Sequence, residues 1–389
     1  MIKRTASETI LRLSKGFPVV AITGPRQSGK TTLSRMVFPD KPYISLEDPD
    51  ARAFADSDPR AFLSRYPDGA ILDEVQRCPD LFSYIQTIVD QDKKMGMYVL
   101  TGSQQFGLRS KITQSLAGRV GMVQLLPFSY GELAAAGVAP ADLETAIYTG
   151  SYPALYDRDV SPSDWYSAYV GTYVERDLHQ LINVRELKIF QLFMRMCAAR
   201  TGQLLNFSSL ANDCGITHNT AKAWLSVLEA SYILYLLQPH HRNFSKRLTK
   251  SPKLYFYDTG LVSWLLGIQD SRQISIHSMR GALFETWIMA ELVKGRFNRG
   301  LQSNLFFWRD STGNEVDVVA EQGELLIPVE VKAGRTVTAD YFGPMNKWRA
   351  LAGEAAGSAH LVYAGNDFQK RSEVTVLPWH GVTELAEKL

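Results

Sequence analysis

The first third of the sequence alternates short apolar runs with stretches in which apolar residues recur at helical spacing. One such helical stretch is 81–89, Leu-Phe-Ser-Tyr-Ile-Gln-Thr-Ile-Val. Strands are predicted at 18–23, 43–46, 70–74, 97–101 and 122–126. Strands that alternate with helices indicate an α/β fold with a parallel sheet and helices on both of its faces.

The pattern changes after this region. Residues 140–200 are rich in helical spacing, and 203–265 read as several short helices. From about 280 a helix leads into strand-like runs at 304–309, 315–320 and 324–332. These runs predict a separate, small α/β domain at the end of the chain.

Composition adds limits rather than a function. The chain has 389 residues, of which 45% are hydrophobic and 21% charged, which is typical of a globular protein with two or three domains. The net charge is only +2, so a nucleic-acid-binding surface would have to be local. The three cysteines are far apart, which argues against a disulfide framework or structural zinc and favours a reducing cytoplasm. No apolar run approaches the ~20 residues of a membrane helix, so we expect a cytoplasmic protein without a membrane segment.

The chemistry begins with one loop. It has the phosphate-loop pattern G-x-x-x-x-G-K-[ST] and reads Gly24-Pro25-Arg26-Gln27-Ser28-Gly29-Lys30-Thr31. A predicted strand precedes it, and a helix-prone run that begins at Thr32 follows. The glycines let backbone N–H groups face a triphosphate, while Lys30 reaches the β- and γ-phosphates and Thr31 offers a hydroxyl to Mg²⁺. We expect residues 24–32 to bind the nucleotide; the alternative is an ordinary glycine-rich turn.

An apolar strand ends in Asp73 and Glu74. Behind a phosphate loop, Asp73 would hold the Mg²⁺ shell and Glu74 would orient the attacking water. The alternative is a strand that stops at a charged turn. A later strand ends at Ser103 and Gln104, which could sense the γ-phosphate, Ser103 being the first candidate, or could form a polar turn.

Arg119 lies where a helix is predicted to end before the strand at 122–126. In oligomeric ring ATPases an arginine at this place reaches into the neighbouring subunit and stabilises charge on the transferred phosphoryl group. The alternative is a surface arginine that is favoured near a helix C-terminus.

The middle of the chain has the pattern of a helix-turn-helix. A helix from about Leu204 meets a glycine turn, and a second helix is predicted over 217–230 with apolar Ala221, Trp224, Leu225 and Leu228 on one face. Its first turn is polar and basic, with His218, Asn219 and Lys222. The segment 239–253 then carries five Lys/Arg and no acid, as in the basic wing of a winged helix placed against DNA phosphates. The alternatives are a protein-interaction module and, for the basic segment, a solvated loop. For His240 and His241 we also expect a solvated loop.

The last region places two carboxylates and a lysine in a suggestive order. Glu330 and Lys332 share one face of a strand, and Asp317 on a neighbouring strand could join Glu330 in holding a divalent ion, Mg²⁺ or Mn²⁺. Lys332 would orient water, and Glu285 on the preceding helix would complete the metal shell. This arrangement resembles the restriction-endonuclease-like fold and predicts a nuclease; surface ion pairs are the alternative. Arg309, Asp310 and Glu315 are nearby; each could contribute to the site or be an ordinary loop charge.

Taken together, the runs resemble the AAA+ superfamily, and more closely the bacterial and archaeal AAA+ ATPases with a C-terminal domain of unknown function. Besides the phosphate loop, the matching runs are 72–76, 100–104, 118–120, 125–129, 150–153, 253–261 and 328–332. The resemblance spans nearly the whole chain and implies the AAA+ fold with ATP as the nucleotide. A second sensor arginine cannot be placed, and Arg176 is a candidate whose alternative is an intrahelical ion pair.

From these patterns we expect four parts. They are an AAA+ ATPase domain at 1–140, a helical lid or linker at 141–200, a winged helix-turn-helix at 201–270 and a restriction-endonuclease-like domain at 271–389. The favoured function is an oligomeric ATPase that acts on DNA. The alternatives are an ATP-dependent switch or scaffold for protein partners, and an ATP-regulated transcription factor.

Overall fold

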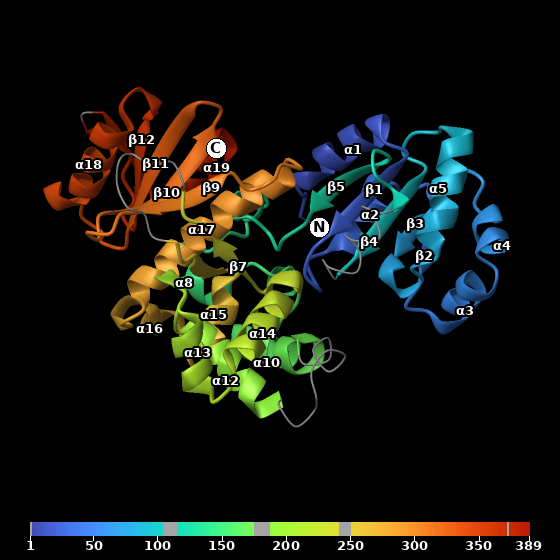
Figure 1. Cartoon of the computed structure of the whole chain (residues 1–389), viewed down its shortest axis with the longest axis horizontal. Coiled ribbons are helices and arrows are strands. Elements are labelled where there is room, and N and C mark those ends of the chain that lie inside the picture. The colour runs from blue at the N-terminus through green and yellow to red at the C-terminus, as the bar shows by residue number, and fades with distance from the viewer. Residues whose placement is uncertain (1, 104–114, 175–186, 241–249, 372) are drawn as a thin grey trace. The chain divides into compact units, whose positions relative to one another are not determined.

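The computed structural model describes residues 2–103, 115–174, 187–240, 250–371 and 373–389 (Figure 1). The chain forms two compact units, which we call the N-terminal and C-terminal units. The N-terminal unit comprises Met1–Phe128, Ala230–Tyr232 and Phe297–Leu301. The C-terminal unit comprises Ser129–Glu229, Ile233–Arg296 and Gln302–Leu389. Among the helices of the described ranges, none is long and apolar enough to cross a membrane.

The N-terminal unit is built on a parallel sheet of five strands in the order β2-β3-β4-β1-β5. The strands are β1 (Val19–Thr23), β2 (Tyr43–Ser45), β3 (Ile71–Asp73), β4 (Tyr98–Gly102) and β5 (Val120–Gln124). All five predicted strands are confirmed, with ends shifted by one or two residues. The phosphate loop follows β1, which lies between β4 and β5 in this sheet; the sheet is blue to cyan in Figure 1.

Helices cover both faces of this sheet, as the alternation of side chains along β1 shows. Val20 and Ile22 pack on one face with Ile10 and Leu33, whereas Val19 on the other face packs in a core that α4 and α5 supply. The helices of this unit are α1 (Ala6–Gly16), α2 (Lys30–Val37), α3 (Pro49–Ser57), α4 (Pro59–Ser64), α5 (Leu81–Asp92) and the 3₁₀ turn η1 (Val75–Arg77).

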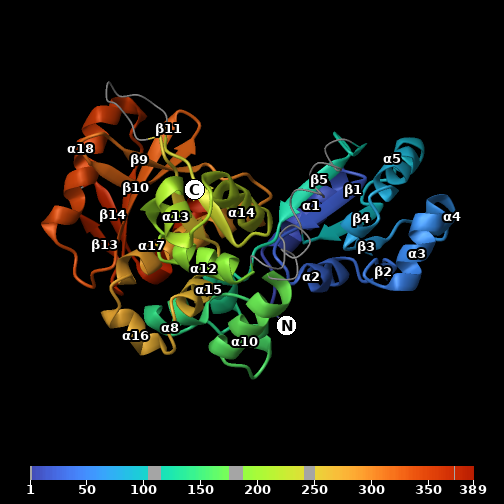
Figure 2. The same cartoon turned by 60° about the horizontal axis from the view of Figure 1, so that its bottom comes forward.

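The first half of the C-terminal unit is mainly helical (Figure 2). Its helices are α7 (Tyr130–Ala135), α8 (Leu143–Thr149), α9 (Ala154–Asp157), α10 (Pro162–Tyr169), the π-helix η2 (Val170–Val174), α12 (Leu187–Ala198), α13 (Phe207–Cys214), α14 (His218–Ala230), α15 (Thr259–Leu265) and α16 (Ser271–Ile276). A small antiparallel sheet has the order β6-β8-β7, with β6 (Gln203–Leu204), β7 (Leu234–Leu237) and β8 (Lys253–Phe256). The predicted pair of helices around a glycine turn is confirmed as α13 and α14 with Gly215 between them in the left-handed region.

The second half contains a six-stranded mixed sheet in the order β13-β14-β12-β11-β10-β9. Its elements are α17 (Arg280–Asn298), β9 (Leu305–Arg309), β10 (Glu315–Gln322), β11 (Leu325–Lys332), η4 (Ala339–Phe342), α18 (Gly343–Ala352), η5 (Gly353–Ala355), β12 (Ala359–Tyr363), β13 (Gln369–Arg371), β14 (Val374–Pro378), η6 (Trp379–Gly381) and α19 (Val382–Lys388). The predicted strands β9, β10 and β11 are confirmed. Trp308 on β9 and Trp348 on α18 are fully buried in one core cluster, which anchors this helix to the sheet.

A buried polar network joins segments of the C-terminal unit that are far apart in sequence. Asp258, which caps the N-terminus of α15, accepts hydrogen bonds from Leu261 N, from Ser151 N and Oγ, and from the Tyr166 hydroxyl at 2.6–2.9 Å. Lys294 on α17 extends the network by donating to Ser151 Oγ at 3.0 Å. The network brings together the runs 150–153 and 253–261, which carried part of the family resemblance.

Candidate functional site

The phosphate loop has the backbone that its glycines predict. Gly24 has a φ of 155° and Gly29 a φ of 90°, and Gln27 also has a positive φ, of 63°. A Cβ atom at position 24 would lie 2.1 Å from the Leu125 carbonyl oxygen, so only glycine lets the loop start beside β5. Gly29 then leads directly into α2, which places the helix N-terminus at the end of the loop.

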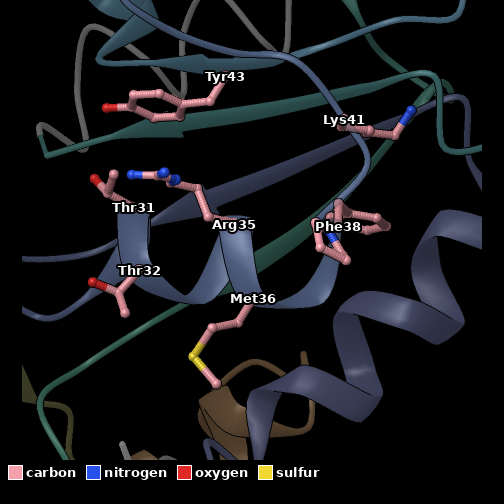
Figure 3. Close-up of a pocket in the computed structure, with 8 residues that line it drawn as sticks. Thr31, Thr32, Arg35, Met36, Phe38, Lys41 and Tyr43 are labelled. Carbon is pink, nitrogen blue, oxygen red and sulfur yellow. The ribbon is translucent and has the colours of Figure 1, made fainter.

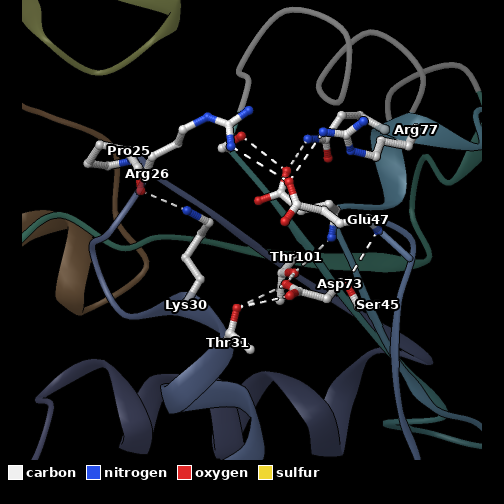
Figure 4. Close-up of polar contacts among 12 residues, drawn as sticks. Pro25, Arg26, Lys30, Thr31, Ser45, Glu47, Asp73, Arg77 and Thr101 are labelled. Carbon is white, nitrogen blue, oxygen red and sulfur yellow. Dashed lines mark hydrogen bonds and ion pairs between the residues drawn. The ribbon is translucent and has the colours of Figure 1, made fainter. Parts of the chain in front are cut away.

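Two cations hold this loop, one from within and one from outside it. The ammonium of Lys30 donates to the carbonyl oxygens of Gly24 and Pro25 at 3.0 and 2.7 Å, so it lies over the loop (Figure 4). Arg4 is buried and donates to the carbonyls of Ser28 and Leu126 at 2.9 and 2.7 Å. Arg4 therefore ties the loop to the segment after β5.

Three hydroxyl groups converge on the carboxylate of Asp73. Thr31 Oγ1 lies 3.0 Å from Asp73 Oδ2, and the Tyr43 hydroxyl donates to the same oxygen at 2.7 Å. Thr101 Oγ1 donates to Oδ1 (Figure 4). Burial and this bond to Asp73 raise the pKa of Tyr43, so the phenol keeps its proton and acts as a donor. The predicted juxtaposition of the loop threonine and the strand aspartate is thus present.

Glu74 follows Asp73 in a left-handed backbone conformation, with a φ of 55°, which is costly for a non-glycine residue. Its Oε2 accepts a hydrogen bond from Ser103 Oγ at 3.1 Å and another from the Gln76 amide. Ser103, the first sensor candidate, therefore lies beside Glu74. Gln104, the second candidate, lies outside the described residues.

A small charge cluster flanks the loop. Glu47 accepts from Arg77 at 3.2 Å and lies 3.7 Å from the Arg26 guanidinium, which belongs to the phosphate loop (Figure 4). The two arginines therefore gather on the loop side of the sheet, where an anionic ligand would meet positive charge.

A pocket of about 730 Å³ opens along α2 next to Thr31. In Figure 3 the Arg35 guanidinium lies beneath the Tyr43 ring, 5.1 Å from its centroid. The lining residues are Thr31, Thr32, Arg35, Met36, Phe38, Pro39, Lys41 and Tyr43. Thr31 and Tyr43 belong both to this pocket and to the cluster around Asp73, so the pocket adjoins that carboxylate.

Arg119 forms a two-point ion pair with Asp90 inside the N-terminal unit. Its Nη2 lies 2.8 Å from Asp90 Oδ2, and its Nε donates to Oδ1. These bonds lower the pKa of Asp90. In this chain Arg119 is a partly exposed, paired arginine, and its reach into a neighbouring subunit stays a prediction.

In the C-terminal unit the predicted acids and lysine do come together. Lys332 lies 2.5 Å from Glu330 Oε1 and 3.5 Å from Asp317 Oδ2, and Asp317 also accepts from Val331 N at 2.9 Å. Glu285 on α17 is also part of the cluster, because its charge acts on the same groups. Burial and the neighbouring Asp317 raise the pKa of Glu285 to about 7 and that of Glu330 to about 8.

A second lysine enters this cluster from β8. Lys253 is buried, lies 3.0 Å from Glu285 Oε1 and forms an ion pair with Glu315, which Arg309 also contacts. The basic-wing prediction is therefore wrong for Lys253, because its ammonium is buried among acids and faces no phosphate. Within the described ranges no group of three or more His, Cys, Asp or Glu is arranged to hold a metal ion. As they stand, these residues do not fit a bound divalent ion.

His240 and Asp310, two residues near this cluster, have surroundings that the structure defines. His240, for which the sequence favoured a solvated loop, is buried and bonded to Glu321 at 2.9 Å. Asp310 accepts four hydrogen bonds from Thr312 and Asn314, which identifies it as the organiser of its turn. Its pKa is lowered because these bonds outweigh its burial.

The chain was compared with known proteins. The family model described as "AAA domain" matches residues 16–134, and two described as "Domain of unknown function" (DUF8612 and DUF4143) match 140–272 and 280–382. The uncharacterized proteins Rv2008c of Mycobacterium tuberculosis and Mb2031c of Mycobacterium bovis are each 32% identical over 339 residues, or 86% of this chain and 74% of the relative. The chain belongs to the AAA+ ATPases that carry a C-terminal domain of unknown function.

Solved structures are similar at low identity. The Walker-type ATPase PABY2304 of Pyrococcus abyssi has 15% identity and a TM-score of 0.46, covering 67% of this ATPase and 94% of that chain. AMPPCP-bound DnaA from Aquifex aeolicus has 13% identity and a TM-score of 0.30, over 58% of this chain and 85% of that chain. A RuvB structure from Thermotoga maritima has 14% identity and a TM-score of 0.29, over 59% and 86%.

The residues of this AAA+ ATPase fit Mg²⁺ with a triphosphate. Thr31 and Asp73 bring hydroxyl and carboxylate oxygens together, which are the donors that Mg²⁺ prefers. When bound, the ion would neutralise charge on the phosphates. The loop amides and Lys30 would hold the phosphates.

Sequence reasoning missed several residues of this ATPase site. Arg4, Tyr43 and Thr101 touch the phosphate loop or Asp73, but nothing in their local sequence marks them. Tyr43 and Thr101 reach Asp73 because β2 and β4 flank β3 in the sheet, so the signal lies in the strand order rather than in spacing. Arg176, His241 and residues 242–249 of the basic segment lie outside the described residues.

Proposed function

We propose that this AAA+ ATPase forms an oligomer and uses ATP hydrolysis to act on DNA. The observation that supports DNA binding is the surface of α14. Its back-face residues Ala221, Trp224, Leu225 and Leu228 are buried, while His218, Asn219 and Lys222 in its first turn are exposed. A buried back face with an exposed polar N-terminal turn is how recognition helices meet the major groove.

The DNA proposal is tested by fluorescence anisotropy with labelled duplex and single-stranded DNA over a series of salt concentrations. We expect affinity to fall as salt rises, because Lys222 and the basic segment would displace counterions from phosphates. Lys222→Ala is expected to weaken binding and reduce the salt slope by about 1. The matched control is Ser226→Ala, which changes an exposed residue on the same helix, two turns from its start.

Two other outcomes of this assay would redirect the proposal. Absence of DNA binding at low salt would favour the alternative in which the α13–α14 region and the last domain bind protein partners. Strong preference for one DNA sequence over competitor DNA would favour an ATP-regulated transcription factor.

Residue roles in hydrolysis are part of the proposal. Lys30→Ala is expected to abolish nucleotide binding. The Lys30 ammonium lies over the phosphate loop, where it is the positive charge that would meet the phosphates. Glu74→Gln is expected to bind ATP and hydrolyse it far more slowly, since the amide keeps the size of the side chain but cannot accept a proton from water. Hydrolysis by Glu74→Gln at the wild-type rate would show that Glu74 has another role.

The oligomer is tested by mixing two inactive variants. Arg119→Ala keeps a complete phosphate loop, and Glu74→Gln keeps the arginine. If Arg119 acts on the neighbouring subunit, the mixture hydrolyses ATP faster than either variant alone. If Arg119 acts only as the partner of Asp90, mixing restores nothing and Asp90→Ala has the same effect as Arg119→Ala.

Metal-dependent DNA cleavage by the last domain is a second candidate, and it would require the acidic side chains to rearrange before they could hold a divalent ion. The observation in its favour is the convergence of Asp317, Glu330 and Lys332 on one buried site. The test is cleavage of plasmid DNA with Mg²⁺ or Mn²⁺, comparing the wild type with Asp317→Ala and Lys332→Ala. Cleavage that is equal in all three proteins would exclude these residues as the catalytic set.

A further inference from the structure

The turns that close α13 and α14 share one backbone pattern. In each, the N–H of an isoleucine after the helix donates to the carbonyl five positions back, at 3.0 Å: Ile216 to Ala211 after α13, and Ile233 to Leu228 after α14. The residue before each isoleucine lies in the left-handed region, as this helix ending requires. After α13 that residue is Gly215, with a φ of 65°, which is the usual choice because glycine has no Cβ.

After α14 the same position holds Tyr232, with a φ of 56°. This conformation is costly for a bulky side chain, so the backbone alone does not account for a tyrosine here. The Tyr232 side chain is also buried, with 1% of its surface exposed. A strained, buried tyrosine where glycine would close the helix equally well indicates that the side chain itself has a role.

The hydroxyl of Tyr232 reaches the strand that leads into the phosphate loop. It lies 2.8 Å from Thr23 Oγ1, and Thr23 is the last residue of β1, directly before Gly24. Both hydroxyls are buried inside the N-terminal unit, because Ala230–Tyr232 belong to this unit although the chain before and after them belongs to the C-terminal unit. A segment far away in sequence therefore contacts the start of the nucleotide-binding loop.

Thr23 is placed to pass a constraint on to the loop. It pairs with β4 on one side and β5 on the other, and its carbonyl accepts from Leu125 N at 2.7 Å. The carbonyl of the next residue, Gly24, accepts from Lys30 Nζ at 3.0 Å. A hydrogen bond to the Thr23 side chain thus acts one residue from the contact between the loop and its lysine. A loop that is already held in place loses less conformational freedom when a nucleotide binds.

We propose that Tyr232 is a positioning residue of the ATPase site, whose hydroxyl holds the end of β1 and ties nucleotide binding at the phosphate loop to the turn that closes α14. The tie acts in both directions, because a coupling between two sites changes both binding free energies equally. A nucleotide that orders the loop steadies the turn, and a partner that moves the turn changes the affinity for ATP. This role requires only nucleotide binding and is independent of whether α14 meets DNA.

The first measurement is hydrogen–deuterium exchange of the full chain with and without Mg²⁺ and the non-hydrolysable analogue AMPPCP. In the wild type the analogue is expected to slow exchange in the phosphate loop and at residues 231–234, where the Ile233 N–H closes α14. Tyr232→Phe keeps the ring but lacks the hydroxyl, so its loop should stay protected while the protection at 231–234 is lost. Thr23→Val should show the same loss, and Thr23→Ser, which keeps a hydroxyl, should retain the protection.

Steady-state ATPase kinetics separate this role from a purely structural one. Tyr232→Phe is expected to raise the KM for ATP by about threefold to tenfold, the effect of one neutral hydrogen bond, with little change in kcat. The matched control is Tyr235→Phe on β7. It removes a buried hydroxyl that has no hydrogen-bond partner within the described residues, and should leave both values unchanged.

Three results would overturn the role of Tyr232. The first is equal nucleotide-dependent protection at 231–234 in the wild type and in Tyr232→Phe, even if the KM rises. The second is a wild type whose phosphate loop is protected by AMPPCP while residues 231–234 are not. The third is an equal rise of the KM in Tyr235→Phe, which would point to a general loss of packing. If Tyr232→Phe does not fold, the two Thr23 variants test the same bond from the strand side.

Discussion

At the scale of single residues, the carboxylate of Asp73 is held by three hydroxyls that come from three different elements. Thr31 comes from α2, Tyr43 from β2 and Thr101 from β4. Tyr43 and Thr31 also line the pocket beside α2. The Tyr43 hydroxyl donates to Asp73 Oδ2, and Thr31 lies within hydrogen-bond distance of both carboxylate oxygens.

Tyr43→Phe removes this hydroxyl and leaves the ring against Arg35. We expect the Mg²⁺ concentration for half-maximal ATPase activity to rise by about tenfold or more, since one hydrogen bond to a charged group is worth about 1.5–3 kcal/mol. The turnover number at saturating Mg²⁺ is expected to change little. Tyr84→Phe on α5 is the matched control; an equal shift in that variant would show that Tyr43 has no special role.

Arg4 acts on the other side of the phosphate loop. Its guanidinium bonds two carbonyls and lies 4.8 Å from the centroid of the Phe128 ring. We expect Arg4→Ala to raise the KM for ATP by about tenfold, because the loop loses the contacts that hold it against the segment after β5. Steady-state ATPase kinetics measure the change.

The control for Arg4 is its neighbour Lys3, whose side chain is exposed and pairs with Glu8. Lys3→Ala is expected to leave the KM unchanged. If both variants raise the KM equally, net charge near the N-terminus rather than the bonds of Arg4 is responsible.

How well the role of a single residue could be predicted depends on where its partners lie along the chain. Lys30, Thr31, Asp73 and Glu74 belong to runs whose spacing carries the chemistry, and the structure brings them together. Lys253 was assigned to a basic surface because its neighbours in sequence are basic. Its true partners lie 32 and 62 positions away along the chain, and only the packing of β8 beside the last domain brings them near.

At the scale of elements, the N-terminus of α15 carries more than a helix cap. Asp258 caps the helix through Leu261 N and also accepts bonds from Ser151 and Tyr166, so one carboxylate orders three segments. Gly150 and Gly260 are needed here, because a Cβ atom at either position would lie within 2.3 Å of the Tyr166 hydroxyl.

Asp258→Ala tests this role against a matched cap. Asp270 caps α16 through Arg272 N but is partly exposed to solvent, so Asp270→Ala should lower the Tm only slightly, as for an ordinary cap. Asp258→Ala should cost at least about 3 kcal/mol, because it also leaves buried donors unpaired. All seven tryptophans belong to the C-terminal unit, so thermal unfolding followed by tryptophan fluorescence reports both variants. Equal losses of Tm would contradict the network.

Whether a strand could be predicted from the sequence depends on how apolar it is and on how near its partner strands lie along the chain. The strands β1, β3 and β4 are fully buried runs, mostly apolar, because both faces of the sheet are covered there, whereas the edge strands β2 and β5 are partly exposed. The sequence predicts all five. The strands β12, β13 and β14 were not predicted. β13 (Gln369–Arg371) is a short, polar edge strand. β12 pairs with β11 across the intervening α18, and β14 pairs with β12 and β13.

At the scale of the whole molecule, buried acids make stability depend on pH. The pKa of Glu330 is raised to about 8 from an ordinary 4.5, and that of Glu285 to about 7. Between pH 4.5 and 8 the folded chain therefore binds more protons than the unfolded chain. The contribution of these two acids to stability is greatest below this range and is lost as the pH rises through it. His360 acts in the opposite direction, but its lowered pKa of about 4 confines its effect to below about pH 6.5.

The range from pH 6.5 to 8 therefore reports mainly on the acidic cluster, because the buried cysteines, whose pKa values are also raised, reduce stability only as the pH approaches their ordinary value of 9.0. We expect the free energy of unfolding of the wild type to fall across this range, by at most about 1.4 kcal/mol per pH unit for each titrating acid. In Glu330→Gln the neutral amide cannot titrate, so its curve should be flatter by the contribution of one group. The measurement is urea unfolding followed by tryptophan fluorescence in the presence of a metal chelator, since a bound cation would lower the pKa of the same acids. Parallel curves for the two proteins would mean that Glu330 stays ionised in the folded chain. The lysines would then neutralise the acids, and Glu330 would bind no proton.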